Sequence, residues 1–297
     1  QVEVPTIVRP EGESASWWFR AGAAEAASRG AMEGKARNLI VFVGDGMSLP
    51  TVAAARILAG QRRGQSGEEY RLSWEHFPAT AFSRTYTTNM QTPDSAGTMS
   101  AMATGVKTRT GVINVAQSMP RGDCSGLAQA QLVSLWELAS EAGMDIGVVT
   151  TTRLTHATPA ATLAHGPERD WENDAALPEA AHAAGGRDIA LQMIVNGAGQ
   201  GAKGGGRKHF MRADQADPEY PQLRGERKDG QDLVALWQRR HPDGRYAWNA
   251  GQLANAPADA PLLGLFEPDH MQWEDQRASD PSGEPSLAEM THAAITR

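Results

Sequence analysis

The chain has 297 residues, of which 40% are hydrophobic and 21% charged, a balance typical of a globular protein. Its formal net charge of −7 argues against a nucleic-acid-binding protein, because contact with a phosphate backbone requires an excess of basic side chains. No run approaches the roughly eighteen apolar residues that a membrane-spanning helix needs. We therefore expect a globular protein that acts on small molecules, with no nucleic-acid-binding surface and no transmembrane segment.

Two features of the sequence bear on its compartment. The single cysteine, Cys124, excludes an intrachain disulfide bond, which is compatible with a reducing cytoplasm and with an exported bacterial protein that has no disulfides. The sequence starts at Gln1 rather than at methionine. Removal of a signal peptide would explain that start, and so would trimming of disordered N-terminal residues or a start point chosen within a longer sequence. We expect an exported protein, periplasmic or extracellular, whose signal peptide has been removed.

Strand and helix patterns alternate along the first half of the chain. Residues 1–36 are predicted to form an N-terminal helical segment. The apolar run 39–43 is typical of a strand buried on both faces of a parallel sheet. Residues 51–60 then indicate a helix that ends at its final glycine. The amphipathic segment 132–143 predicts another helix, and residues 145–152 predict a second strand.

This alternation predicts an α/β fold, an α/β/α sandwich around a largely parallel central sheet. We expect residues 37–195 to form the core portion that carries the chemistry. The glycine- and proline-rich stretch 196–285 is expected to be an elaborated surface region, and residues 286–297 to return to the core as a helix. Ligands gather at the carboxyl ends of parallel strands, so Asp45 and the segment 153–161 are expected on one rim.

The stretch TPDSAGT, residues 92–98, contains the strongest candidate for a nucleophile. Thr92 is the expected helix N-cap and Pro93 the first helical position, which places Ser95 in the first turn. There the positive end of the helix favours an anion. A serine hydroxyl needs a base or a metal to become an attacking oxyanion, and no histidine lies nearby in the sequence. A metal is therefore the more economical activator.

Small residues follow Ser95, and two interpretations of them remain open. Ala96 and Gly97 could mark a helix packed closely against its neighbours, or they could leave a substrate access to the serine hydroxyl. Asp45, between two glycines, fits either a metal-binding carboxylate or an ordinary turn or N-cap aspartate.

A third candidate group lies in THATPAATLAHGPERDW, residues 155–171. Thr158 followed by proline indicates a helix cap and first helical position, and His156 or Thr158 could bind or orient a metal. Arg169 offers the planar fork of N–H donors that grips two phosphate oxygens. Each residue also has an ordinary structural interpretation, a satisfied core histidine or a surface ion pair.

Taken together, these motifs resemble the alkaline phosphatase family, and specifically its animal-like branch. The resemblance covers residues from about 36 to 297 and rests on motifs in the family's order: NLIVFVGDGM, PDSAGT followed by GVKT, GVVTTTRLTHATPA, GGGRK, DPEYP, GLFEP and PSLAEMTHAAI. It implies a metal-dependent phosphomonoesterase that works at alkaline pH through a covalent phosphoserine, with two zinc ions and one magnesium ion.

The resemblance also implies a role for each matching residue. Ser95 matches the zinc-activated nucleophile, and Asp45 the aspartate that bridges a zinc and a magnesium. Thr158 matches a magnesium ligand, and His156 a position behind that metal's direct ligands. Arg169 matches the arginine that clamps the phosphoryl oxygens. Asp94 matches the aspartate that orients this arginine. With this resemblance, we expect the small residues after Ser95 to leave space for a phosphate, its metals and the arginine.

A calcium site is a further implication of the animal-like branch. By motif match, its ligands would be Glu219, the backbone carbonyl of Phe266, Glu267 and Glu284. Oxygen ligands suit calcium. Relatives usually have aspartate at the fourth position, where this chain has the longer Glu284. Four ordinary surface acids are the alternative interpretation.

The sequence departs from the family in two places. Relatives continue past EMTHAAITR into segments that supply most zinc ligands, and the eight histidines here show no zinc-site spacing. We therefore expect this chain to be the N-terminal portion of a longer polypeptide. The disulfide partner of Cys124 in animal relatives falls near Gly185 and Gly186, so that bridge is absent here.

Two other functional classes remain open at this stage. One is a related hydrolase of the same superfamily that acts on diesters or sulfate esters, although PDSAGT with a matching arginine favours monoesters. The other is a non-catalytic metal-binding remnant that ends at Arg297. The expected partners are phosphate monoesters and inorganic phosphate. The N-terminal segment around Trp17 and Trp18 would either pack across a homodimer, as in animal relatives, or cover its own sheet.

Overall fold

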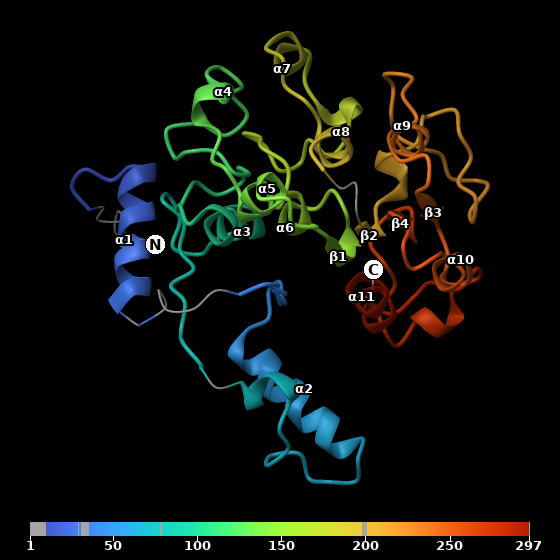
Figure 1. The fold of residues 1–297 in the computed structure, drawn as a ribbon, viewed down its shortest axis with the longest axis horizontal. Coiled ribbons are helices and arrows are strands. Elements are labelled where there is room, and N and C mark those ends of the chain that lie inside the picture. Colours follow the sequence, from blue (N-terminus) through green and yellow to red (C-terminus); the bar gives the residue numbers. More distant parts are fainter. Residues whose placement is uncertain (1–9, 29, 31–35, 78, 198–200, 297) are drawn as a thin grey trace, which may run out of the picture. The chain divides into compact units, whose positions relative to one another are not determined.

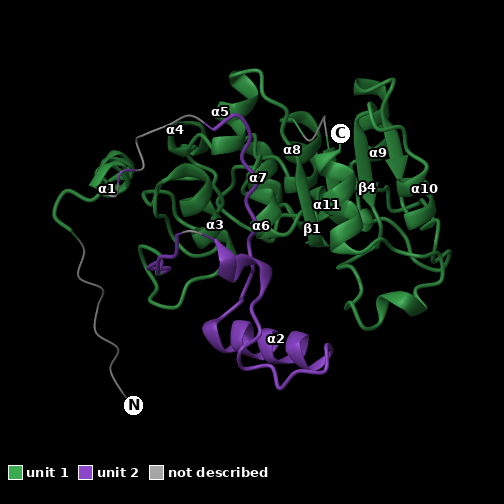
Figure 2. Cartoon of the chain, turned by 60° about the horizontal axis from the view of Figure 1, so that its bottom comes forward, with its two compact units in different colours: residues 1–29, 86–297 green, residues 30–85 purple. Residues whose placement is uncertain are grey.

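The computed structural model describes residues 10–28, 30, 36–77, 79–197 and 201–296 (Figure 1). The chain divides into two compact units, coloured separately in Figure 2. Unit 1 comprises residues 1–29 and 86–297, and unit 2 comprises residues 30–85. Each unit is described by itself.

Unit 1 is built on a parallel four-stranded sheet. Its strands are β1 (Val148–Arg153), β2 (Gly201–Gly205), β3 (Arg245–Ala247) and β4 (Leu262–Leu265), in the order β1-β2-β4-β3. Val148 pairs with Ala202, and Leu262 with both Gly201 and Arg245. Parallel strands need crossover connections, which here contain helices and long loops. The parallel sheet confirms the predicted α/β class.

Unit 1 also contains ten α-helices among its described residues (Figure 1). They are α1 (Ala15–Ser28), α3 (Ser95–Thr104), α4 (Leu127–Ala130), α5 (Leu135–Glu141), α6 (Ala157–Ala160), α7 (Glu179–Ala183), α8 (Ile189–Val195), α9 (Leu233–Arg240), α10 (Ala250–Ala254) and α11 (Leu287–Ile295). Helix α11 packs on β1, α9 and α10 pack on β3, and α3 contacts α5 and α6. The main core joins sheet and helix side chains, among them Leu154, Leu163, Met193, Ile194, Phe210, Trp237, Leu263 and Leu265.

The predicted strand at 145–152 is confirmed as β1, and the helix predicted at 132–143 is found as the shorter α5. Ser134 and Glu137 form a capping box that starts α5 three residues later than the apolar pattern alone suggests. Gly143, with φ at +76°, follows its end.

The stretch 196–285, expected to be a surface region, supplies three of the four strands found in the described part of unit 1. Strand β2 is glycine-rich because its neighbours come very close. A Cβ at Gly204 would lie 2.6 Å from the Thr150 methyl group, and one at Gly205 would overlap the carbonyl of Asp269. Such a strand has no alternating apolar pattern by which the sequence could reveal it.

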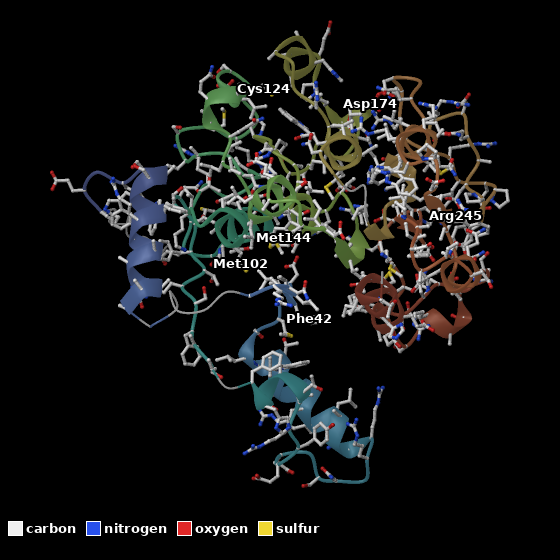
Figure 3. All side chains as sticks on the ribbon, viewed as in Figure 1. Phe42, Met102, Cys124, Met144, Asp174 and Arg245 are labelled. Atoms are coloured by element: carbon white, nitrogen blue, oxygen red, sulfur yellow. The ribbon has the colours of Figure 1, made fainter. Side chains whose placement is uncertain are left out.

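Unit 2 contains α2 (Leu49–Gln61), capped by Ser48, and a short 3-10 helix at Ser73–His76. The predicted helix at 51–60 is therefore confirmed, with two residues more at its start and one more at its end. The predicted strand at 39–43 is wrong. Among the described residues of this unit none forms a strand, so within the unit the apolar run has no partner strand. Its side chains are exposed, including Phe42 at 71% (Figure 3).

Helix α1 contacts residues of unit 1 that lie further along the chain. The indole ring of Trp18 lies edge-on to the Tyr86 ring, with centroids 6.4 Å apart. The Lys107 ammonium lies 3.9 Å from the centroid of Tyr86 and 5.9 Å from that of Trp18. These cation–π and aromatic contacts show that α1 covers a loop of its own chain. Within the described residues, no helix is both long and apolar enough to cross a membrane.

We predict that Gly186→Cys forms a disulfide bond with Cys124. A Cβ built at Gly186 lies 3.1 Å from the Cys124 sulfur, which is buried beside Trp171, Leu177 and Ala181. Closing the long loop between these positions should stabilise the protein by about 4 kcal/mol, less any strain against the Ala181 carbonyl. Thiol titration and the urea midpoint, with and without reductant, measure both effects.

Gly185→Cys is the matched control for this variant. A Cβ at Gly185 has nothing within 4 Å, and φ there is +80°, so its thiol should stay free and the variant should gain no stability. Equal oxidation of the two variants would contradict the close approach of residues 124 and 186.

Candidate active site

Asp94 caps the helix that carries Ser95. Helix α3 begins at Ser95, and the Asp94 carboxylate accepts a hydrogen bond from the backbone N–H of Gly97 at 3.0 Å. The sequence analysis placed the cap two residues earlier, at Thr92, with Pro93 as the first helical residue, and that is wrong. An aspartate accepts more strongly than a threonine and its charge suits the positive helix end, so the helix starts later. Ser95 is consequently the first helical residue.

The same carboxylate joins α3 to two other parts of the chain. Its Oδ2 atom accepts hydrogen bonds from the backbone N–H of Gly111 and from Nη1 of Arg169, each at 3.0 Å. The side chains of Asp94 and Arg169 are each only 19% exposed. Arg169 also donates from its backbone N–H to the carbonyl of Gly111. The arrangement brings Arg169 to the carboxylate that caps the helix carrying Ser95.

The small residues after Ser95 serve close packing. Ala96 is fully buried, and a Cβ at Gly97 would lie 2.5 Å from the Thr87 methyl group and 3.0 Å from the Arg109 carbonyl. The sequence analysis expected these small residues to leave space for a phosphate and its metals, but at these two positions the structure shows a closely packed helix. Ser95 itself is half-buried.

His156 and Thr158 lie just beyond the carboxyl end of β1, in the segment that the sequence placed on this rim. Helix α6 is a single turn whose N-cap is His156, so the predicted cap at Thr158 is wrong and Thr158 lies inside the turn. The His156 Nε2 atom lies 3.0 Å from Nη2 of Arg169. Because Arg169 can only donate, His156 accepts at Nε2 and has its proton on Nδ1. Helix α6 packs against α3.

Asp45 belongs to unit 2, where it is exposed in a turn before α2 and is followed by Gly46 with φ at +65°. It does not follow a strand, contrary to the expectation for residues 39–43. The structure thus brings together Asp94, Ser95, His156, Thr158 and Arg169, and it leaves Asp45 in the other unit.

A metal site beside Ser95 would need more ligands than the residues described above provide. Among the residues that the structure describes, we find one group of three or more His, Cys, Asp or Glu side chains close enough to hold an ion. That group does not include Ser95 or its neighbours. A zinc ion needs about four such ligands. The described residues around Ser95 therefore do not make a zinc site by themselves.

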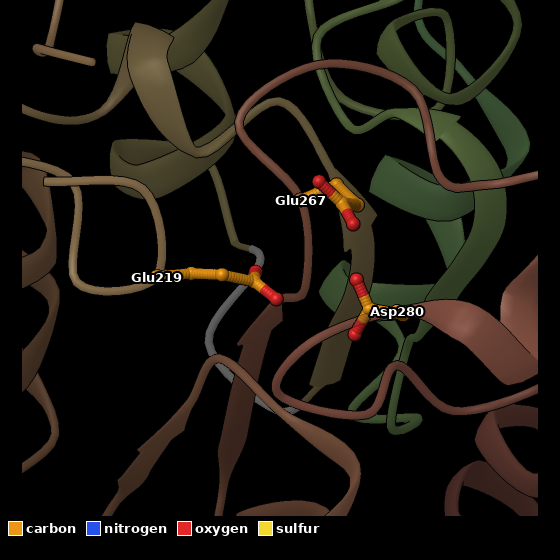
Figure 4. A group of neighbouring side chains, drawn as sticks. All are labelled: Glu219, Glu267 and Asp280. Carbon is orange, nitrogen blue, oxygen red and sulfur yellow. The ribbon is translucent and has the colours of Figure 1, made fainter. Parts of the chain in front are cut away.

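The gathered acids are Glu219, Glu267 and Asp280, which converge in Figure 4. One oxygen from each lies within 4.8 Å of the others. Glu267 is 3% exposed, and burial together with the charges of its two neighbours raises its pKa to about 8. Burial and Asp280 likewise raise the pKa of Glu219, although the Arg207 guanidinium 3.3 Å away opposes the shift. Three converging acids of this kind suit a hard cation such as calcium.

This acid cluster differs in one member from the expected calcium ligands. Asp280 was missed, and the structure brings it rather than Glu284 to Glu219 and Glu267. Both oxygens of Glu284 instead accept from the Gln272 backbone N–H at 3.1 Å, and its burial raises its pKa to about 7. Phe266 precedes Glu267 and is fully buried. In the sequence, the one hint of a role for Asp280 was that it lies in the same loop as the expected ligand Glu284.

Comparison with known proteins identifies the family. The family model described as alkaline phosphatase matches residues 36–297.

The chain belongs to the alkaline phosphatase family.

Relatives and solved structures support this assignment. The chain is 42% identical to the membrane-bound alkaline phosphatase of Bombyx mori, over 99% of this chain and 56% of that protein. It is 43% identical to the tissue-nonspecific alkaline phosphatase of Rattus norvegicus, over 88% of this chain and 51% of the relative. Thermus thermophilus alkaline phosphatase has a similar structure, with a TM-score of 0.66 and 30% identity over 90% of this chain and 50% of that one. The chain spans about half the length of these relatives.

The acid cluster predicts how the stability of this alkaline phosphatase chain varies with pH when no metal is present. Glu267 has an ordinary pKa of 4.5 when unfolded and about 8 when folded. Between these values the folded state binds more protons, so the free energy of unfolding should fall as the pH rises from about 4.5 to about 8. Urea unfolding in chelator at several pH values measures the slope.

Two comparisons isolate the cluster. Glu267→Gln should flatten the slope, and calcium added to the unsubstituted protein should restore stability at the upper end of the window. Glu179→Gln, at the start of α7 and outside the cluster, should leave the slope unchanged. A slope that is the same with and without Glu267 would show that this carboxyl group titrates normally.

Proposed function

We propose that the protein to which this chain belongs hydrolyses phosphate monoesters at alkaline pH through a covalent phosphoserine on Ser95. The observation that carries the proposal is the arrangement of Asp94: one carboxylate caps the helix that begins at Ser95 and also binds Arg169. The arrangement fits phosphoryl transfer, which depends mainly on positioning and on neutralising the charge of the transferring oxygens. Membership of the alkaline phosphatase family supports the same chemistry.

The reaction proceeds in two displacements. In the first, the Ser95 oxygen forms a bond to phosphorus and loses its proton, while the bond from phosphorus to the alcohol oxygen breaks and the alcohol leaves with a proton. In the second, water attacks the phosphoserine, which releases inorganic phosphate and restores the serine hydroxyl. The N-terminal end of α3 favours the negative charge that develops near Ser95. The N–H groups of Arg169 that Asp94 and His156 do not engage would bind two phosphoryl oxygens.

Metals complete this proposal. The family resemblance implies two zinc ions and one magnesium ion, to which Asp45, Ser95 and Thr158 would contribute, with His156 behind the magnesium. When bound, such ions stabilise charge on the attacking and leaving oxygens. We propose a calcium site separately, held by Glu219, Glu267 and Asp280, on the strength of their convergence. We also propose that the protein is exported to the periplasm or the extracellular space.

Ser95→Ala tests the proposal. Hydrolysis of p-nitrophenyl phosphate at alkaline pH, measured after metals are stripped and zinc and magnesium are restored, should fall by at least about a thousandfold because no other group can form the covalent intermediate. Ser125→Ala, in an exposed loop, is the control and should retain full activity. Zinc-dependent turnover that survives Ser95→Ala would refute the phosphoserine mechanism. No turnover by the unsubstituted protein would refute the phosphatase assignment itself.

A further inference from the structure

A second histidine lies beside the residues that hold Arg169. The ring of His270 packs against that of His156, with centroids 5.6 Å apart and an angle of 66° between the planes. This is an edge-to-face arrangement, which aromatic rings prefer over direct stacking. Since His156 accepts the hydrogen bond from Nη2 of Arg169, its ring orientation decides whether that bond forms. A half-turn of the ring would remove Nε2 from Arg169.

His270 is itself held on two sides by one residue, although it lies at the surface. Its Nδ1 atom lies 3.1 Å from the backbone nitrogen of Arg153, and its Nε2 atom lies 2.8 Å from Nη1 of the same arginine. Its own backbone N–H donates to Asp269 at 2.8 Å. An exposed ring without such contacts would sample several rotamers, whereas this one is fixed against the end of β1.

Arg153 is a firm support because it belongs to a dense ionic network. Its Nη2 donates to Glu172 at 2.7 Å and its Nη1 to Asp269 at 2.8 Å. Asp269 also accepts from Lys208 at 2.8 Å. These partners raise the pKa values of Arg153 and Lys208 and lower the pKa of Asp269. Arg153, Lys208 and Asp269 therefore remain charged at alkaline pH. The network ties the loop after β4 to the end of β1.

We propose that His270 is a positioning residue for phosphate binding: its ring fixes the orientation of His156, which in turn holds Arg169 facing Ser95. This role rests on the phosphatase function proposed above. His270 does not touch the reacting atoms and supplies no proton. Its effect is on the alignment of the guanidinium that would bind the phosphoryl oxygens, where small displacements weaken binding and reaction together.

Two substitutions separate the ring contact from the hydrogen bonds of His270. His270→Phe keeps a ring against His156 and removes both ring nitrogens, of which one can accept from Arg153 in the neutral imidazole. His270→Asn keeps a polar atom near the backbone of Arg153 and removes the ring. His292, an exposed histidine on α11, provides the controls His292→Phe and His292→Asn. All four variants are made in the complete, metal-loaded protein, and their melting temperatures are compared first.

Kinetics are the first readout. His270→Asn should raise KM for p-nitrophenyl phosphate and the inhibition constant of inorganic phosphate by a common factor of roughly three to ten, with kcat changed less. His270→Phe should stay within about twofold of the unsubstituted protein because it keeps the edge-to-face contact. Unchanged constants in His270→Asn, or equal losses in the two variants, would overturn the proposal.

A second readout does not depend on activity and so separates this proposal from the phosphatase function. In ¹⁵N spectra of the imidazole rings at alkaline pH, His156 should show a protonated Nδ1 and an accepting Nε2 in the unsubstituted protein and in His270→Phe. In His270→Asn the two nitrogen signals should move toward each other as the ring loses its fixed tautomer. Identical His156 signals in all variants would overturn the proposal even if the protein hydrolyses phosphate esters.

Discussion

The geometry of the candidate active site depends on the carboxylate of Asp94. This single side chain satisfies an orphan amide of the first turn of α3, the amide of Gly111 and the guanidinium of Arg169. Each bond involves a charged partner and is stronger than a neutral one, and the carboxylate is too enclosed for water to replace all three donors. Ser95 and Arg169, far apart in the sequence, therefore lie on either side of one acid.

Around this centre, side chains from several loops hold one another in place. Arg169 reaches His156, the His156 ring meets His270, and His270 contacts Arg153 at the end of β1. The same loop that carries His270 begins with Glu267, a member of the acid cluster with Glu219 and Asp280. The carboxyl ends of β1 and β4 thus lead to two distinct sites, one suited to an anion and the other to a cation. Parallel strands bring such loops to one edge of a sheet.

The sequence predicted the fold class and β1 because continuous apolar runs and capped amphipathic helices mark these elements strongly. It could not reveal β2, since glycines chosen for close backbone approach carry no apolar pattern. It misplaced the caps of α3 and α6 by two residues each. In α3 the Asp94 carboxylate accepts from a first-turn amide, whereas the His156 side chain makes no such bond in α6. Asp94, His156 and Arg169 were proposed as site residues through motifs. His270 and Asp280 were not, because their roles arise from contacts between loops distant in the sequence.

A double-mutant cycle on Asp94 and Arg169 tests the central claim most directly. Affinity for inorganic phosphate would be measured by calorimetry for the unsubstituted protein, Asp94→Asn, Arg169→Lys and the double variant. If Asp94 acts by positioning Arg169, the two losses should not add, with a coupling energy of about 1–3 kcal/mol. Losses that add to within about 0.5 kcal/mol would contradict the account, because Asp94 would then support only the helix and not the guanidinium.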